Sequence, residues 1–232
     1  MSAASLGVGR PLPSATLRTT GWLVGRTLRI LAVVAPLILA LAIGVAPAVM
    51  AYFAVDSQGS LWSFAVQQAF PVFTLAIGAM AMAHLPIHLA FGMTRRSFAA
   101  AVVLTVLAIA AVLALLVPLG YGLEGAVFRG YGWAHAVPEG LGAAMLTAAL
   151  RTAVWGLVGA LNAALWYRFG GVVGVVLAPV AAILPLVAAA MWIERAAPFG
   201  PAEVGLLVGL IALLVAVYAV VVLGVAVKGK SA

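Results

Sequence analysis

Long apolar runs, each long enough to cross a membrane, are the feature that most constrains this chain. Six of them alternate with short polar connections. A membrane-spanning helix needs about 20 predominantly apolar residues, because the hydrocarbon core is about 30 Å thick. A helix also satisfies its backbone N–H and C=O groups internally, as hydrocarbon requires. The six runs comprise residues 30–55, 61–91, 98–119, 141–167, 172–193 and 204–227.

The composition indicates an integral membrane protein. Hydrophobic residues make up 66% of the chain and charged residues 7%, whereas soluble domains carry about 25% charged residues. Cysteine is absent, which excludes disulfides, thiolate metal sites and cysteine nucleophiles. We therefore predict an all-α fold, with a cytoplasmic N-terminal tail over residues 1–20 and a single six-helix transmembrane domain over residues 21–232.

The segment before the first run mixes apolar and basic residues. Leu17, Trp22 and Leu28 alternate with Arg18 and Arg26. This pattern predicts a short amphipathic helix lying in the membrane interface. The alternative interpretation is that these cations are the basic flank of the first span.

The distribution of cations predicts the orientation, because Lys and Arg are retained in cytoplasmic loops. With six spans and both termini in the cytoplasm, the cytoplasmic side of a cell membrane holds nine of the 12 Lys and Arg residues, whereas five or seven spans would place the basic C-terminal tail outside. All five carboxylates then fall on the outer side. The nine cations are Arg10, Arg18, Arg26, Arg29, Arg95, Arg96, Arg168, Lys228 and Lys230.

Arg151 is the one cation expected within the membrane. It lies about ten residues into the run 141–167, which predicts a position near mid-depth. A charge there costs about 2.5–3.5 kcal/mol on insertion scales, so Arg151 must face the bundle interior, a wet cavity or a subunit interface. Gln67 and Gln68, at a similar depth, are its candidate partners. Two roles stay open: a contact for an anionic or amphipathic substrate, and a structural hydrogen-bond hub.

No pattern of residues indicates catalysis. His84 and His88 share a helix face, but Leu85 stands where a zinc protease has glutamate, and no acidic residue is expected on that side. We predict no metal site, no cofactor, no nucleic-acid partner and no enzymatic activity. The sequence also lacks the phosphate-binding loop that ends in Gly-Lys-Ser/Thr. Without a carboxylate in the membrane, proton- or sodium-coupled transport is disfavoured.

The sharpest polar break in the first half of the chain is the junction 91–98. Gly92 can end the preceding helix, since glycine adopts the left-handed conformation freely. Thr94 can cap the next helix. Arg95 and Arg96 then occupy its first turn, where the helix dipole disfavours cations.

Two explanations for these arginines stay open. One is topological, with cations retained at a short cytoplasmic turn. The other is a docking element, which presents the cations, a hydroxyl group and the flanking Phe91 and Phe98 to an acidic or grooved cytoplasmic partner.

The segment Gly92-Met93-Thr94-Arg95-Arg96-Ser97-Phe98 resembles the G-x-T-R-R-x-F junction of bacterial ABC transporter permease subunits. The type-2 exporter class is similar in length, in its six spans, in its cytoplasmic termini and in an interfacial helix before the first span. The resemblance implies that the junction is a coupling element against a separately encoded cytoplasmic ATPase, which binds the ATP. The implied docking residues are Gly92, Thr94, Arg95, Arg96 and Phe98.

We expect a second permease, identical or homologous, because six helices alone seldom enclose a pathway, and we expect membrane lipids as further partners. The small number of polar groups inside the bundle favours an apolar or amphipathic substrate. The chain departs from this family on the outer side. Many such permeases have re-entrant extracellular helices between the last two spans, whereas here that connection, 194–203, is short and the larger outer loop is 120–140. The alternatives are a non-transporting membrane scaffold or accessory subunit and, less favoured, a small secondary transporter.

Overall fold

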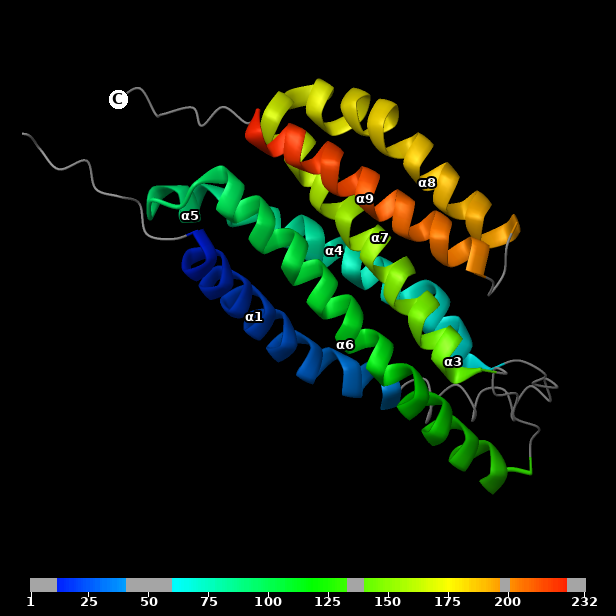
Figure 1. Cartoon of the computed structure of the whole chain (residues 1–232). Helices are drawn as coiled ribbons and strands as arrows, with labels where there is room; N and C mark the ends of the chain where they lie inside the picture. Colours follow the sequence, from blue (N-terminus) through cyan, green and yellow to red (C-terminus); the bar gives the residue numbers. More distant parts are fainter. Residues whose placement is uncertain (1–11, 41–59, 133–139, 197–200, 225–232) are drawn as a thin grey trace, which may run out of the picture.

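The computed structural model describes residues 12–40, 60–132, 140–196 and 201–224, and these ranges are almost entirely helical (Figure 1). The long helices run along one common direction, so that the connections gather at two ends of a bundle. The helices are α1 (Leu12–Ala40), α3 (Leu61–Phe64), η2 (Ala65–Ala69), α4 (Phe70–Ala83), α5 (Leu85–Ala90), α6 (Arg95–Gly130), α7 (Leu141–Phe169), η3 (Val173–Leu177), α8 (Ala178–Ala196) and α9 (Pro201–Leu223).

Helix α7 is the centre of the bundle and packs against α4, α6, α8 and α9. Glycines bring α4 and α7 into backbone contact: a Cβ atom on Gly78 would overlap the carbonyl of Gly156, and one on Gly159 would overlap the carbonyl of Leu75. Small residues allow this close approach between membrane helices, where packing rather than water exclusion drives association.

Four helical stretches are long and apolar enough to cross a membrane: Ala65–Ala90, Arg95–Gly130, Leu141–Phe169 and Pro201–Leu223. This confirms the prediction of a helical membrane protein. The structure does not establish six spans. The apolar part of α8, Pro179–Ile193, is shorter, and the first predicted span, 30–55, starts inside α1 and continues beyond the described residues.

Helix α1 begins earlier than the sequence predicts. Residues 12–20 were expected in a polar tail, yet the helix is continuous from Leu12. Thr16 and Thr19 are buried and donate hydrogen bonds to the Ser97 carbonyl (3.5 Å) and the Met93 sulfur (3.0 Å). The polar hydroxyl groups for which a tail was predicted therefore bind α1 to the rest of the bundle.

Helix α6 continues to Gly130, where the sequence predicts a loop from residue 120. Tyr121 and Phe128 are buried, and the bare backbone of Gly120 lies against the Trp62 ring, where a Cβ atom would overlap it. Packing of this kind outweighs the low helix propensity of glycine. The remainder of the predicted loop includes residues 133–139, which lie outside the described part of the chain.

Prolines explain why the predicted helix 61–91 is divided. Proline cannot donate the bond to the carbonyl four residues earlier, and local π-helical widening absorbs such a gap. Segment η2 contains Gln67, four residues before Pro71, and η3 contains Val175, four residues before Pro179. Pro86 likewise lies just after the turn at His84 that separates α4 from α5.

Candidate functional site

The junction between α5 and α6 is an ordered turn at one end of the bundle. Backbone bonds close the C-terminus of α5, from the N–H groups of Phe91, Gly92 and Met93 to carbonyls inside that helix at 3.0–3.2 Å. Gly92 has a φ of 81°, the left-handed conformation predicted for a glycine that follows a helix.

Thr94 caps α6 as the sequence predicts. Its backbone is extended (φ −79°, ψ 152°), and its hydroxyl oxygen accepts the Ser97 backbone N–H at 3.1 Å. The same hydroxyl donates to the Ser97 side chain at 2.9 Å. Such a cap contributes about 1 kcal/mol, so the direction in which α6 leaves the turn is fixed locally.

The C-terminus of α9 explains why a cation, Arg95, is stable in the first turn of α6. Arg95 donates from its guanidinium to the Leu223 carbonyl at 3.2 Å, and Arg168 at the end of α7 donates to the Val220 carbonyl at 3.2 Å. The last carbonyls of a helix carry partial negative charge. Arg95 is therefore stabilised by a neighbouring helix, although it lies at the unfavourable end of its own.

The other predicted docking residues divide into exposed and buried groups. Phe91 is 83% exposed, and Ile87, one helical turn earlier, is 53% exposed. Arg96 is exposed, whereas Phe98 is fully buried and its ring lies 5.5 Å from that of His88. Phe98 therefore anchors the turn from within and presents no surface to a partner.

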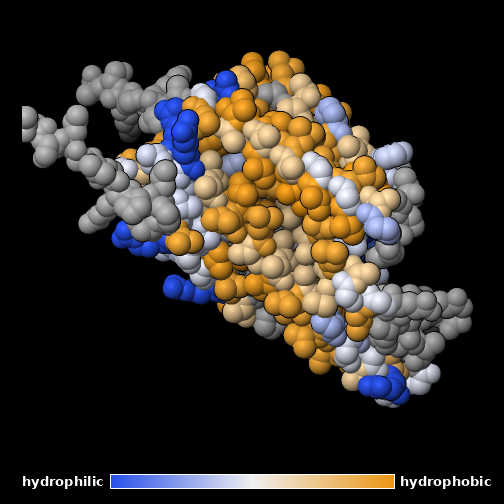
Figure 2. Space-filling view, viewed as in Figure 1, coloured by the Kyte–Doolittle hydropathy of each residue, from blue (hydrophilic) through white to orange (hydrophobic). Residues whose placement is uncertain are grey.

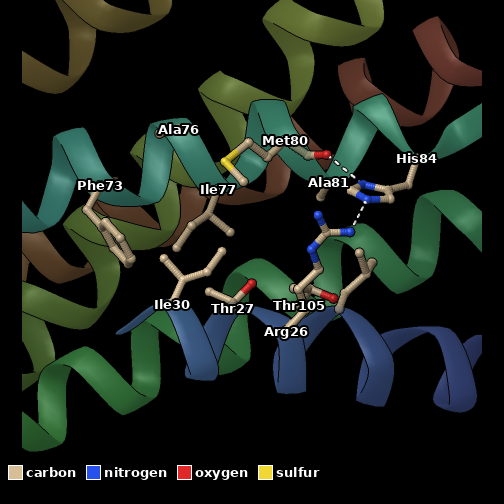
Figure 3. A pocket seen from close by; sticks show the side chains of 11 residues that line it. Arg26, Thr27, Ile30, Phe73, Ala76, Ile77, Met80, Ala81, His84 and Thr105 are labelled. Atoms are coloured by element: carbon tan, nitrogen blue, oxygen red, sulfur yellow. Dashed lines mark hydrogen bonds between the residues drawn. The ribbon is translucent and has the colours of Figure 1, made fainter. Parts of the chain in front are cut away.

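Helix α1 packs against the same end of the bundle through Arg26 and Trp22, which contact the two histidines. Figure 3 shows the contact between Arg26 and His84. Arg26 donates to Nε2 of His84 at 2.9 Å, while Nδ1 of His84 lies 2.9 Å from the Met80 carbonyl. The Trp22 ring packs edge-on against both His84 and His88, at 5.2 and 5.7 Å between centroids.

His84 thus contacts protein groups at both ring nitrogens, whereas His88 makes ring contacts with Trp22 and Phe98. No group of three or more potential metal ligands occurs in the part of the chain that the structure describes. Beside the Arg26–His84 contact, a small cavity of about 60 Å³ lies between α1 and α4. Its wall includes Ile30, Phe73 and Ile77 (Figure 3). Most of its lining is apolar, and its polar residues are Arg26, Thr27, His84 and Thr105.

We use "cation-rich end" for the end of the bundle that carries Arg26, Arg95, Arg96 and Arg168. The opposite end, which we call the carboxylate end, contains Glu124 and Glu203, both buried. The sequence predicts all five carboxylates outside the membrane. It predicts Glu124 and Glu203 in the outer connections 120–140 and 194–203, whereas in the structure they belong to helices α6 and α9 and are packed inside the bundle.

Arg151 forms an ion pair with Glu203. The guanidinium donates to one carboxylate oxygen at 2.6 and 3.2 Å, with Glu203 fully buried and the Arg151 side chain 13% exposed. Glu203 lies in the first turn of α9. Arg151 is therefore level with the start of α9 rather than with its middle, since α7 extends beyond α9 at this end (Figure 1).

The predicted glutamine partners of Arg151 are differently placed. Gln67 donates to the Ser63 hydroxyl at 3.0 Å, and Gln68 is exposed. Gln67 and Arg151 do line a common cavity of about 60 Å³, together with Tyr121 and other residues. A cavity with this volume and these polar walls is large enough for water, so Arg151 faces both its counter-ion and a small polar space.

Glu124 is the second buried carboxylate. It accepts the Ser60 hydroxyl at 2.6 Å and the Trp62 backbone N–H at 3.0 Å. Both donors lie at the start of α3, where negative charge is favourable. The sequence predicts Glu124 in the loop 120–140, and so it did not predict this role. The role becomes apparent only when α6 is extended as a helix past residue 120.

Comparison with known proteins gives no further assignment. No family model matches the chain, and neither a curated protein nor a solved structure matches it.

Proposed function

We propose that this chain is the membrane-spanning permease subunit of an ATP-driven, ABC-type exporter. A separate cytoplasmic ATPase would bind and hydrolyse ATP, and the chain itself would be neither an enzyme nor a cofactor carrier. The proposal includes six spans, both termini in the cytoplasm and a location in the cell membrane. It rests on the G-x-T-R-R-x-F resemblance together with the shape of the α5–α6 turn.

The single observation that carries the proposal is the exposed apolar tip of this turn. Phe91 and Ile87 project from a segment held rigid by the Gly92 turn, the Thr94 cap and the buried Phe98. Exposed apolar patches mark protein or membrane contacts, and the neighbouring Arg96, also exposed, favours a protein contact here. A groove on an ATPase that accepts Phe91 would receive the motion of α4 and α6 directly.

A second permease fits this arrangement. The interior of the described bundle is closely packed around α7, which favours a pathway formed between two copies over one within a single copy. On α9, Gly205 and Gly209 have open space where Cβ atoms would lie, so the backbone of another helix could approach there. We propose a homodimer or a heterodimer with a homologous permease, and an apolar or amphipathic substrate carried between the two.

Affinity purification from native membranes tests the docking proposal. A P-loop ATPase should co-purify with the wild-type chain and give measurable ATP hydrolysis in the eluate. Phe91→Ser should lose most of that ATPase, because it removes the largest exposed contact without touching the core. Phe169→Ser is the matched control, since Phe169 is also exposed, at 49%, at the C-terminal end of α7. Equal ATPase recovery with both variants would refute docking at the turn.

One observation favours the scaffold alternative. Arg95 and Arg151 are both engaged within the chain, so neither has to meet a substrate or a partner to explain its presence. If no ATPase co-purifies while the protein is stably assembled with other membrane proteins, the scaffold is the better assignment. Secondary transport stays less favoured for a revised reason: Glu124 and Glu203 are within the bundle, but both are hydrogen-bonded as structural groups.

A further inference from the structure

A groove between α6 and α9 opens on the outer surface of the bundle and begins at Arg96. It encloses about 580 Å³, and its walls are apolar apart from Arg96 and the Tyr218 ring. The Tyr218 hydroxyl is buried and donates to the Met82 sulfur at 2.9 Å, so it is turned away from the groove. The wall residues are Ala99, Ala100, Val103 and Leu104 of α6 and Val215, Tyr218, Ala219 and Leu223 of α9.

The dimensions of the groove match one leaflet of a bilayer. From Arg96 to Leu104 along α6 the helix rises about 12 Å, at 1.5 Å per residue. Half of the hydrocarbon core is about 15 Å. The surrounding face is broadly apolar (Figure 2), so the groove lies where lipid chains, rather than a water-soluble protein, reach it.

Arg96 supplies a charge that nothing in the described chain balances. No hydrogen bond or ion pair within the described residues engages its guanidinium. Arg95 has the C-terminal carbonyls of α9, whereas Arg96 stands in the first turn of α6, where the helix dipole adds further positive potential. An anion with an apolar tail would neutralise Arg96 and fill the groove at the same time.

We propose that this groove binds an anionic phospholipid, with the headgroup phosphate at Arg96 and one acyl chain between α6 and α9. A second copy of the chain is a poorer occupant. A copy inserted in the same orientation would bring its own cation-rich end to Arg96, and both buried carboxylates described in the chain lie at the opposite end. This inference is independent of the proposed transport function, because it leaves Phe91 and Ile87 free for another partner.

The absence of cysteine permits a direct test with one engineered thiol. Ala100→Cys places a fluorophore in the groove of the purified chain, reconstituted in phosphatidylcholine vesicles. Lipids with brominated acyl chains quench it on contact. We expect brominated phosphatidylglycerol to associate about fivefold more strongly than brominated phosphatidylcholine, the preference that one lysine or arginine gives for an anionic lipid. Arg96→Gln should abolish this preference, and Arg96→Lys should retain most of it.

Two controls separate specific binding from general surface charge. Arg29→Gln removes an exposed cation of α1, which does not line the groove, and should leave the preference unchanged. A fluorophore at Val180→Cys, an exposed site on α8, should be quenched equally by both lipids. Ala219→Phe should reduce quenching at position 100 by filling the groove without altering charge.

Three results would overturn the proposal. Equal quenching by the two lipids in the wild-type background would show that Arg96 selects no headgroup. A preference that survives Arg96→Gln would place the anion elsewhere. Quenching by both lipids that disappears as the protein-to-lipid ratio rises, with self-quenching of the fluorophore, would show that a second copy covers the groove.

Discussion

The two ends of the bundle neutralise charge in different ways. At the cation-rich end, Arg95 and Arg168 donate to backbone carbonyls of α9, and Arg26 donates to the His84 ring. At the carboxylate end, Glu203 accepts from the guanidinium of Arg151, and Glu124 accepts from a hydroxyl and a backbone N–H group. One end relies on helix dipoles near the surface, and the other on buried charges.

Helix α9 is bound by charged side chains at both of its ends. Its first turn contains a glutamate bound by Arg151 of α7, and its last carbonyls are bound by Arg95 of α6 and Arg168 of α7. Negative charge at a helix N-terminus and positive charge at its C-terminus both complement the helix dipole. These terminal contacts act together with the buried face of α9, which includes Leu207, Leu214 and Tyr218, to fix its register against α6 and α7.

The largest effect is expected from breaking the buried pair. Glu203→Leu leaves the Arg151 guanidinium buried without its counter-ion, which should destabilise the folded protein by about 3–5 kcal/mol. The double variant Arg151→Leu/Glu203→Leu should recover much of this loss. Denaturation in mixed detergent micelles measures the two single variants, Glu203→Leu and Arg151→Leu, and the double variant. If the single effects add in the double variant, the two residues are not coupled.

An intermediate effect is expected at Glu124. Glu124→Ala leaves the Trp62 backbone N–H and the Ser60 hydroxyl without their acceptor, at a cost of about 1–3 kcal/mol. Hydrogen exchange should accelerate in α3 and η2 while remaining slow in α9. Exchange that accelerates equally in all helices would mean that Glu124 supports the whole bundle rather than the entry of one helix.

The smallest effect is expected at the cation-rich end. Arg95→Gln removes a contact with the last turn of α9 and should cost about 0.3–1 kcal/mol, with faster exchange confined to the C-terminus of α9. Arg96→Gln should leave stability unchanged in detergent, since Arg96 contacts no helix end. A larger loss from Arg96→Gln than from Arg95→Gln would reverse the roles assigned to these neighbours.

Local signals predicted the cation-rich end well. The positions of Gly92 and Thr94 follow from backbone conformation and capping, which depend on a few adjacent residues. The partner of Arg95 could not be predicted from local sequence, because it lies 128 residues away along the chain, on α9. The pairing of Arg151 was missed for a related reason: depth was counted along α7 alone, whereas its level depends on how far α7 extends beyond α9.

Long-range packing also explains the errors in helix boundaries. Glycine content predicted a loop after residue 119, but Trp62 packs on Gly120 and keeps α6 helical. Two prolines widened their helices into π segments instead of ending them. The apolar runs themselves predicted the helical membrane fold, because their length and composition depend on no tertiary contact.

The orientation of the two ends is the claim on which docking depends, and one measurement tests it directly. Single cysteines at Phe91 and Tyr131, both exposed and at opposite ends of α6, can be introduced into a chain that has none. Intact cells are then treated with a membrane-impermeant thiol reagent. We predict labelling of Tyr131→Cys in intact cells and of Phe91→Cys only after permeabilisation. Labelling of Phe91→Cys in intact cells would place the cation-rich end outside and contradict the docking of a cytoplasmic ATPase.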